Sequence, residues 1–152
     1  MTTGDIEIAC DISLPDGLDL DALEALARGV LSDRGADGSV TLVLADDATL
    51  HRLNREFRGT DAPTDVLSFD LQDPVHPSDD ALGEVYISIE RARVQAEADG
   101  RPFQDEMAHL AIHGILHLLG FDHQTKADRN RMRHQERRYL AQETQVVHSK
   151  GA

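Results

Sequence analysis

The segment that decides the fold spans residues 107–123 and reads MAHLAIHGILHLLGFDH. His113 and His117 are four residues apart, so they lie on the same face of any helix that carries them. Gly120 tolerates left-handed backbone geometry, which lets the helix end and the chain fold back. Apolar residues surround this helix on almost every side, as is typical of a buried helix: Met107, Leu110, Ala111, Ile112, Ile115, Leu116, Leu118 and Leu119.

The turn at Gly120 is expected to bring His123 close to His113 and His117. Three neutral imidazoles suit Zn²⁺ and leave a fourth tetrahedral position open, as in catalytic zinc sites. Two histidines at this spacing could be a coincidence in a chain with eight histidines. A third one after the helix-ending glycine is much harder to reach by chance, and unpartnered imidazoles in a core are costly. We therefore expect His113, His117 and His123 to bind one zinc ion per chain.

Length and composition favour a single domain over residues 1–152. The chain has 40% hydrophobic and 28% charged residues, and no apolar run is long enough to span a membrane. A secretory signal is not expected from the first residues. The single cysteine, Cys10, excludes an internal disulfide and fits a reducing cytoplasm. Residues 145–152 are expected to form a disordered tail.

The net charge of −13 weighs against a nucleic-acid partner, because an acidic surface repels phosphate. Basic residues nevertheless cluster in two places, around Arg52, Arg55 and Arg58 and again over residues 129–138. A local cationic patch beside the metal is therefore compatible with the overall charge.

Apolar patterns predict four strands, over residues 6–12, 39–45, 64–71 and 83–89. Helical periodicity predicts five helices, over residues 19–33, 47–57, 90–99, 104–119 and 125–143. This order predicts an α/β (α+β) fold in which a small mixed four-stranded sheet packs with about five helices. The metal-bearing helix is expected to be the central one.

The histidine spacing matches the long zinc-peptidase pattern except at one position. Those peptidases place a glutamate directly after the first histidine, where this chain has Gly114. Asp122 and Glu106 are candidate replacements for the missing base. His109 is either an outer partner of the zinc ligands or a histidine near the helix start, and the second interpretation is favoured.

Arg58 is the other candidate for chemistry. It ends a predicted helix and precedes Gly59, so its guanidinium lies near a loop. Arginine binds phosphate in a fork and stabilises charge in a phosphoryl transition state. A helix-terminal arginine is more often a solvated residue that favours the helix dipole, so this position alone leaves both interpretations open.

Several segments together resemble the YbeY family of bacterial rRNA-maturation endoribonucleases. The resemblance covers most of residues 40–140, with Glu84 standing where a family aspartate is expected, and Met132 and Glu136 also fit. The matching segments are Asn54-Arg-Glu-Phe-Arg-Gly, Pro63-Thr-Asp-Val-Leu-Ser-Phe, Gly83-Glu-Val-Tyr-Ile-Ser and His113-Gly-Ile-Leu-His-Leu-Leu-Gly-Phe-Asp-His.

The resemblance implies an α/β fold and a zinc ion bound by His113, His117 and His123. It also implies single-strand-specific RNA cleavage in ribosomal RNA maturation and ribosome quality control. Arg58 matches the arginine that family members carry opposite the metal, so we expect these four residues to be catalytic. The expected partners are single-stranded or ribosomal RNA and a ribosome or ribosome-associated protein, in the cytoplasm, without DNA or a membrane.

Two other functions remain open at this point. One is a non-catalytic, zinc-containing ribosome assembly factor, in which zinc only braces the helix end. The other is a metallopeptidase-like hydrolase in which Asp122 or Glu106 replaces the missing base.

Overall fold

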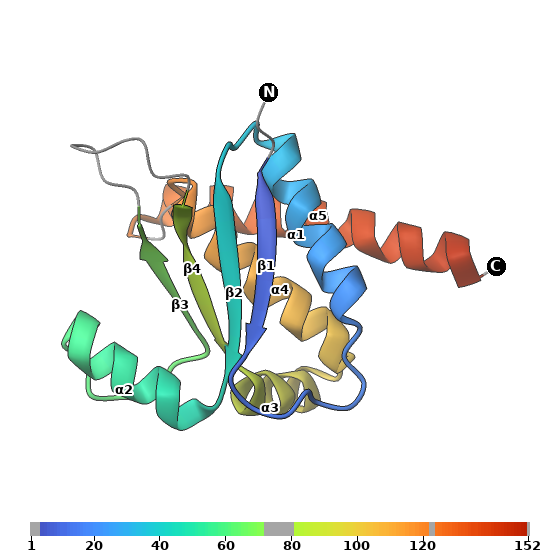
Figure 1. Cartoon of the computed structure of the whole chain (residues 1–152). Coiled ribbons are helices and arrows are strands. Elements are labelled where there is room, and N and C mark those ends of the chain that lie inside the picture. The colour runs from blue at the N-terminus through green and yellow to red at the C-terminus, as the bar shows by residue number, and fades with distance from the viewer. Residues whose placement is uncertain (1–3, 72–80, 122–123, 152) are drawn as a thin grey trace.

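The computed structural model describes residues 4–71, 81–121 and 124–151, with side chains as far as residue 141. Within these ranges the chain forms strands and helices in the predicted order (Figure 1). The elements are β1 (Asp5–Cys10), α1 (Leu20–Asp33), β2 (Ser39–Ala45), α2 (Asp47–Arg58), β3 (Val66–Asp70), β4 (Ala81–Ser88), α3 (Ile89–Asp99), α4 (Phe103–Leu118) and α5 (Lys126–Gly151).

The strands form one mixed sheet in the order β1-β2-β4-β3. β1, β2 and β4 run parallel, and β3 pairs antiparallel with β4, so that Ser68 lies opposite Val85. Parallel neighbours need crossover helices, and α1 connects β1 to β2 in this way. The predicted α/β fold class with a small mixed sheet is confirmed.

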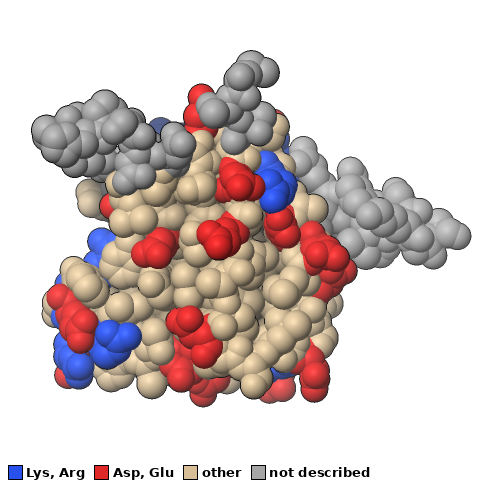
Figure 2. Space-filling view, viewed as in Figure 1, with Lys and Arg blue, Asp and Glu red and all other residues tan. Residues whose placement is uncertain are grey.

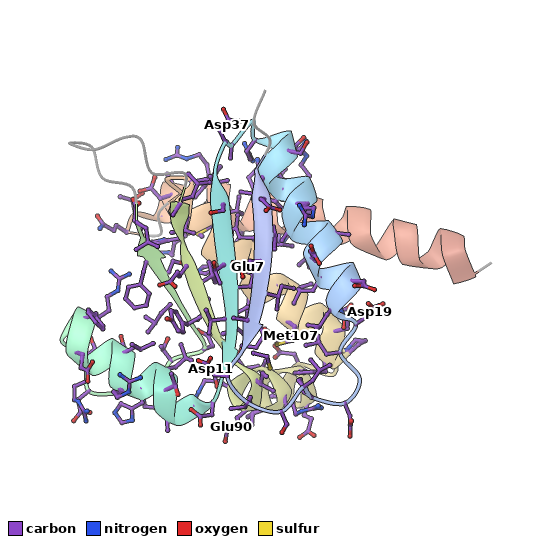
Figure 3. All side chains as sticks on the ribbon, viewed as in Figure 1. Glu7, Asp11, Asp19, Asp37, Glu90 and Met107 are labelled. Atoms are coloured by element: carbon purple, nitrogen blue, oxygen red, sulfur yellow. The ribbon has the colours of Figure 1, made fainter. Side chains whose placement is uncertain are left out.

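The main core lies between one face of the sheet and the helices α1, α3, α4 and α5 (Figure 1). Alternate residues of β2, Val40, Leu42 and Leu44, point into this core because successive side chains of a strand face opposite sides. α4 is buried along most of its length and contributes Met107, which Figure 3 labels, among many apolar side chains. The helix that carries His113 and His117 is therefore the central one, as predicted, while its metal remains a prediction.

Among the described helices, α2 is the one that packs on part of the opposite face of the sheet. A smaller apolar cluster forms there between α2, β2 and β3, and the aromatic rings of Phe69 and Tyr86 pack against it. Figure 2 shows acidic side chains spread over the rest of this face and basic ones gathered around α2. Glu7 and Asp11, labelled in Figure 3, belong to the acidic part.

In the described ranges no helix combines the length and the apolar character needed to cross a membrane.

Several predicted boundaries differ from the structure, among them the ends of the first strand and of the last helix. The first strand ends at Cys10 rather than at Ile12, because β2, its pairing partner, ends at Ala45 and the last bond runs from Asp11 N–H to Leu44 O (3.0 Å). The last helix continues to Gly151 instead of ending near residue 143, since the sequence carries no glycine or proline that stops it earlier.

Candidate active site

α4 presents two of its three histidines to a cavity at the edge of the sheet. His113 and His117 line this cavity, of about 300 Å³, together with Arg58 from α2 and Ser68 from β3. The His113 side chain is 31% exposed, so the imidazole remains accessible from the cavity. Residues that are distant in the sequence and were predicted separately thus share one cleft.

The end of α4 has the geometry that the sequence predicted. Gly120 adopts a φ of 101°, in the left-handed region that glycine tolerates best. Gly120 N–H bonds to His117 O (3.2 Å) and Phe121 N–H to Leu116 O (3.0 Å), which is the Schellman pattern of helix termination. The chain therefore turns back immediately after the second histidine.

Arg58 is fixed in the cleft by its position at the last turn of α2. The helix ends at Gly59, whose φ of 69° reverses the chain. The Arg58 side chain donates a hydrogen bond from Nη2 to Ser68 O. Its guanidinium carbon lies 5.5 Å from the centre of the Phe69 ring, a cation–π distance. These contacts hold the guanidinium beside β3, at the same cavity as His113 and His117.

A second, adjoining cavity of about 360 Å³ extends the cleft past Arg58 and His117. Phe57 lines it and is 64% exposed, although its ring packs edge-on against Phe69 with 5.6 Å between ring centres. An exposed aromatic ring beside a fixed arginine offers a stacking surface next to a positive charge.

Gly114 explains why the peptidase glutamate is absent. A Cβ atom at this position would lie 2.3 Å from Cγ1 of Val85 on β4, well inside van der Waals contact. Ser68 Oγ also donates a hydrogen bond to Gly114 O (2.9 Å), which fixes α4 directly on the sheet. Because α4 and β4 approach so closely here, a glutamate side chain does not fit without displacing the strand.

Glu136 of α5 completes the surroundings of His113. Its carboxylate lies 2.6 Å from His113 Nδ1 and 3.1 Å from His109 Nε2, and the residue is only 6% exposed. Burial raises the pKa of Glu136, but the hydrogen bonds from His109 and His113 outweigh it and lower the pKa to about 2. An ionised carboxylate only accepts hydrogen bonds, so it selects the His113 tautomer with the proton on Nδ1. Nε2 of His113 then carries the lone pair that binds a metal.

The structure corrects the preferred interpretation of His109. The hydrogen bond to Glu136 raises the pKa of His109 above its ordinary value, and Glu106 lies 3.4 Å away on the other side of the ring. His109 thus contacts the carboxylate that orients His113, as the outer-partner interpretation required. The family resemblance had already singled out Glu136, which follows Met132 by four residues and so lies on the same face of α5.

Glu106 does not serve as the replacement base. It is 2% exposed, contacts Arg101 Nε at 3.5 Å, and lines neither of the two cavities at His113 and His117. The other candidate, Asp122, and the third expected ligand, His123, lie outside the described residues. Within the described ranges no group of three His, Cys, Asp or Glu side chains is arranged to hold a metal ion. The donors that are described fit zinc, because His113 and His117 are neighbouring imidazoles and one is oriented by a carboxylate.

Comparison with known proteins gives one consistent family. The family model described as Endoribonuclease YbeY matches residues 16–144. A protein named Endoribonuclease YbeY from Desulfitobacterium hafniense (strain Y51) is 46% identical over 127 residues, which cover 78% of this chain and 81% of the relative. A protein of the same name from Pelotomaculum thermopropionicum is 48% identical over 110 residues, which cover 70% of this chain and 72% of the relative. A solution structure from Thermotoga maritima superposes with a TM-score of 0.68 at 28% identity, covering 95% of this chain and 93% of the other.

Proposed function

This chain belongs to the YbeY family of endoribonucleases, and we propose that it cleaves single-stranded RNA in ribosomal RNA maturation and ribosome quality control, with zinc as its cofactor. The observation that carries the proposal is the shared cavity: Arg58, fixed on Ser68 O, opens onto the same space as His113 and His117. An arginine and two histidines that line one cavity suit a phosphodiester, since arginine binds phosphate in a fork.

In this mechanism Arg58 binds the scissile phosphate and stabilises the charge that develops on it. His113, His117 and His123 would hold Zn²⁺, which would supply a Lewis acid for a phosphoryl oxygen. Glu136 keeps the proton of His113 on Nδ1, which leaves the Nε2 lone pair available as a metal ligand. The attacking oxygen is either water or the neighbouring 2′-hydroxyl, and the two leave different product ends.

The shape of the cleft favours single-stranded over paired RNA. Bases are free to stack on protein side chains only where they are not stacked in a duplex. The exposed ring of Phe57 lies beside Arg58 and offers such a surface. We therefore propose that a base next to the scissile phosphate stacks on Phe57.

The single cysteine, Cys10, requires no oxidising compartment, in keeping with the cytoplasm as the proposed location.

The test is cleavage of end-labelled single-stranded RNA by four proteins purified in parallel: wild type, His117→Ala, Arg58→Ala and His134→Ala. We expect His117→Ala to lose cleavage to background and Arg58→Ala to lose about 10²–10³-fold in kcat. His134 is exposed on α5 and lines neither cavity of the cleft, so His134→Ala should cleave like wild type. A cyclic phosphate on the fragments would identify the 2′-hydroxyl as the nucleophile.

Equal cleavage by wild type and His117→Ala would trace the activity to a contaminating ribonuclease and refute the proposed site. Peptide hydrolysis that survives Arg58→Ala would instead support a metallopeptidase-like hydrolase, which the steric conflict at Gly114 disfavours.

The charge of −13 favours a second candidate, a non-catalytic ribosome assembly factor in which zinc braces the end of α4. That function predicts no RNA cleavage by any of the four proteins, together with ribosome association that survives His117→Ala.

A further inference from the structure

A third cavity, of about 520 Å³, shares His113 with the cleft. Arg101, from the segment between α3 and α4, lines it opposite three arginines of α5, which are Arg129, Arg133 and Arg137. His113 lines both this cavity and the cleft, so the two spaces meet at the proposed catalytic centre. We call the space between Arg101 and the three α5 arginines the arginine groove.

The three α5 arginines are spaced four residues apart, which places them on one face of the helix. Four residues advance a helix by about 6 Å, a spacing comparable to that of successive phosphates in an extended strand. The other two arginines in this part of α5 are engaged elsewhere: Arg131 pairs with Asp128, and Arg138 pairs with Asp33. The arginine groove therefore comprises the members of the α5 cluster that face His113.

Positively charged side chains outweigh negatively charged ones around the arginine groove. Arg101 is compensated by Glu106 and Asp99, and Glu136 is buried against two histidines. Arg133 and Arg137 are exposed and have no ion-pair partner among the described side chains. They are thus available to an anionic ligand.

The open face of the sheet repels such a ligand. The chain has 28 acidic against 15 basic residues, and Figure 2 shows acidic side chains over the open face of the sheet. A polyanion is therefore attracted to the catalytic centre along surfaces where this excess is reversed. The arginine groove is such a surface, and it ends at His113.

We propose that the arginine groove binds the RNA strand on one side of the cleavage point, with successive phosphates on Arg129, Arg133 and Arg137. This inference rests on the proposed endoribonuclease function and adds to it a substrate-binding subsite outside the cleft. Arginine suits the task because each guanidinium forms two parallel hydrogen bonds with a phosphate. RNA is favoured over an acidic protein because the groove is continuous with the cleft through His113.

The experiment compares Arg133→Gln/Arg137→Gln with a control that also removes two positive charges, Arg28→Gln/Arg131→Gln. Arg28 and Arg131 are exposed and paired with acidic residues away from the groove. Each protein is titrated with a labelled single-stranded RNA of about twelve nucleotides by fluorescence anisotropy over a range of salt concentrations. Cleavage is then measured on that RNA and on a dinucleotide that fills only the cleft.

We expect the groove variant to bind the long RNA on the order of tenfold more weakly than the control. Its salt dependence, the slope of log K against log salt, should fall by about 1.4, or 0.7 for each phosphate that is no longer neutralised. On the long RNA its KM should rise while kcat stays unchanged. On the dinucleotide both variants should behave alike, which a structural defect at Glu136 would not allow.

Equal affinity and equal salt slopes for the two variants would overturn the groove while leaving the endoribonuclease proposal intact. A difference in affinity without any cleavage would support the groove and refute the nuclease. A wild type that neither binds nor cleaves RNA would overturn both proposals. Unchanged RNA binding with loss of an acidic protein partner in the groove variant would assign the surface to that partner instead.

Discussion

α4 and α5 both contribute side chains to the surroundings of His113, but they are held in the molecule in opposite ways. α4 is buried on nearly all sides between the sheet and its neighbouring helices. Among the described side chains of α5, only Met132, Glu136 and Tyr139 are buried. The comparison shows that the helix that carries His113 is fixed by packing, while the helix that supplies Glu136 to it is fixed by a few buried side chains. The exposed face of α5 is therefore free to carry charge.

The largest effect is expected from Gly114→Ala, which tests how tightly α4 is packed. The new methyl group would overlap Val85, so we expect a loss of about 1–3 kcal/mol in the free energy of unfolding, measured in urea. The matched control is Gly29→Ala in the exposed part of α1, where a Cβ meets nothing within 4 Å. That change should stabilise the protein by about 0.5–1 kcal/mol. Equal effects at the two glycines would show that α4 does not approach β4 closely.

The next effect is expected from Glu136→Gln, which removes the carboxylate that α5 supplies to His113. Loss of a carboxylate partner of a ligand histidine typically weakens metal binding by about 10–100-fold. Competition with a chromophoric zinc chelator would measure the change, and Glu97→Gln, at an exposed position of α3, provides the control. Unchanged zinc affinity in Glu136→Gln would show that the carboxylate on α5 does not contribute to metal binding.

The smallest effect is expected from Tyr139→Phe, which removes one anchor of α5. Tyr139 OH donates to Asp33 Oδ2 at 2.5 Å, and this bond holds the pKa of Asp33 below its ordinary 3.8. A depressed carboxyl pKa contributes stability above pH 3.8 that is lost as the pH falls through the lower pKa of the folded state. We therefore expect Tyr139→Phe to be slightly less stable than wild type at neutral pH.

Urea unfolding of both proteins at several pH values would measure this difference, which should shrink below pH 3.8 as Asp33 becomes protonated. A difference that stays constant down to strongly acidic pH would assign the role of Tyr139 to packing alone.

Much of the fold follows from local pattern. The order of strands and helices, the central place of α4 and the end of that helix at Gly120 were all predicted, because burial imposes a strong period on a sequence. The membership in the YbeY family was predicted correctly for a related reason, since its motifs occupy short contiguous segments. The ends of the first strand and of the last helix were predicted less accurately. The first depends on where the pairing strand ends, and the second lies among surface residues with a weak hydrophobic pattern.

The sequence by itself determined which residues are candidates for chemistry: Arg58, His113 and His117, with His123 remaining a prediction. Only the tertiary structure decided that Arg58 and the two histidines share a cavity, that Val85 excludes a side chain at Gly114, and that Glu136 orients His113. The physical reason is distance along the chain. Hydrophobic periodicity and helix capping depend on residues that are close in the sequence. The contacts named here join α2, β4 and α5 to α4, and they form only when the core packs.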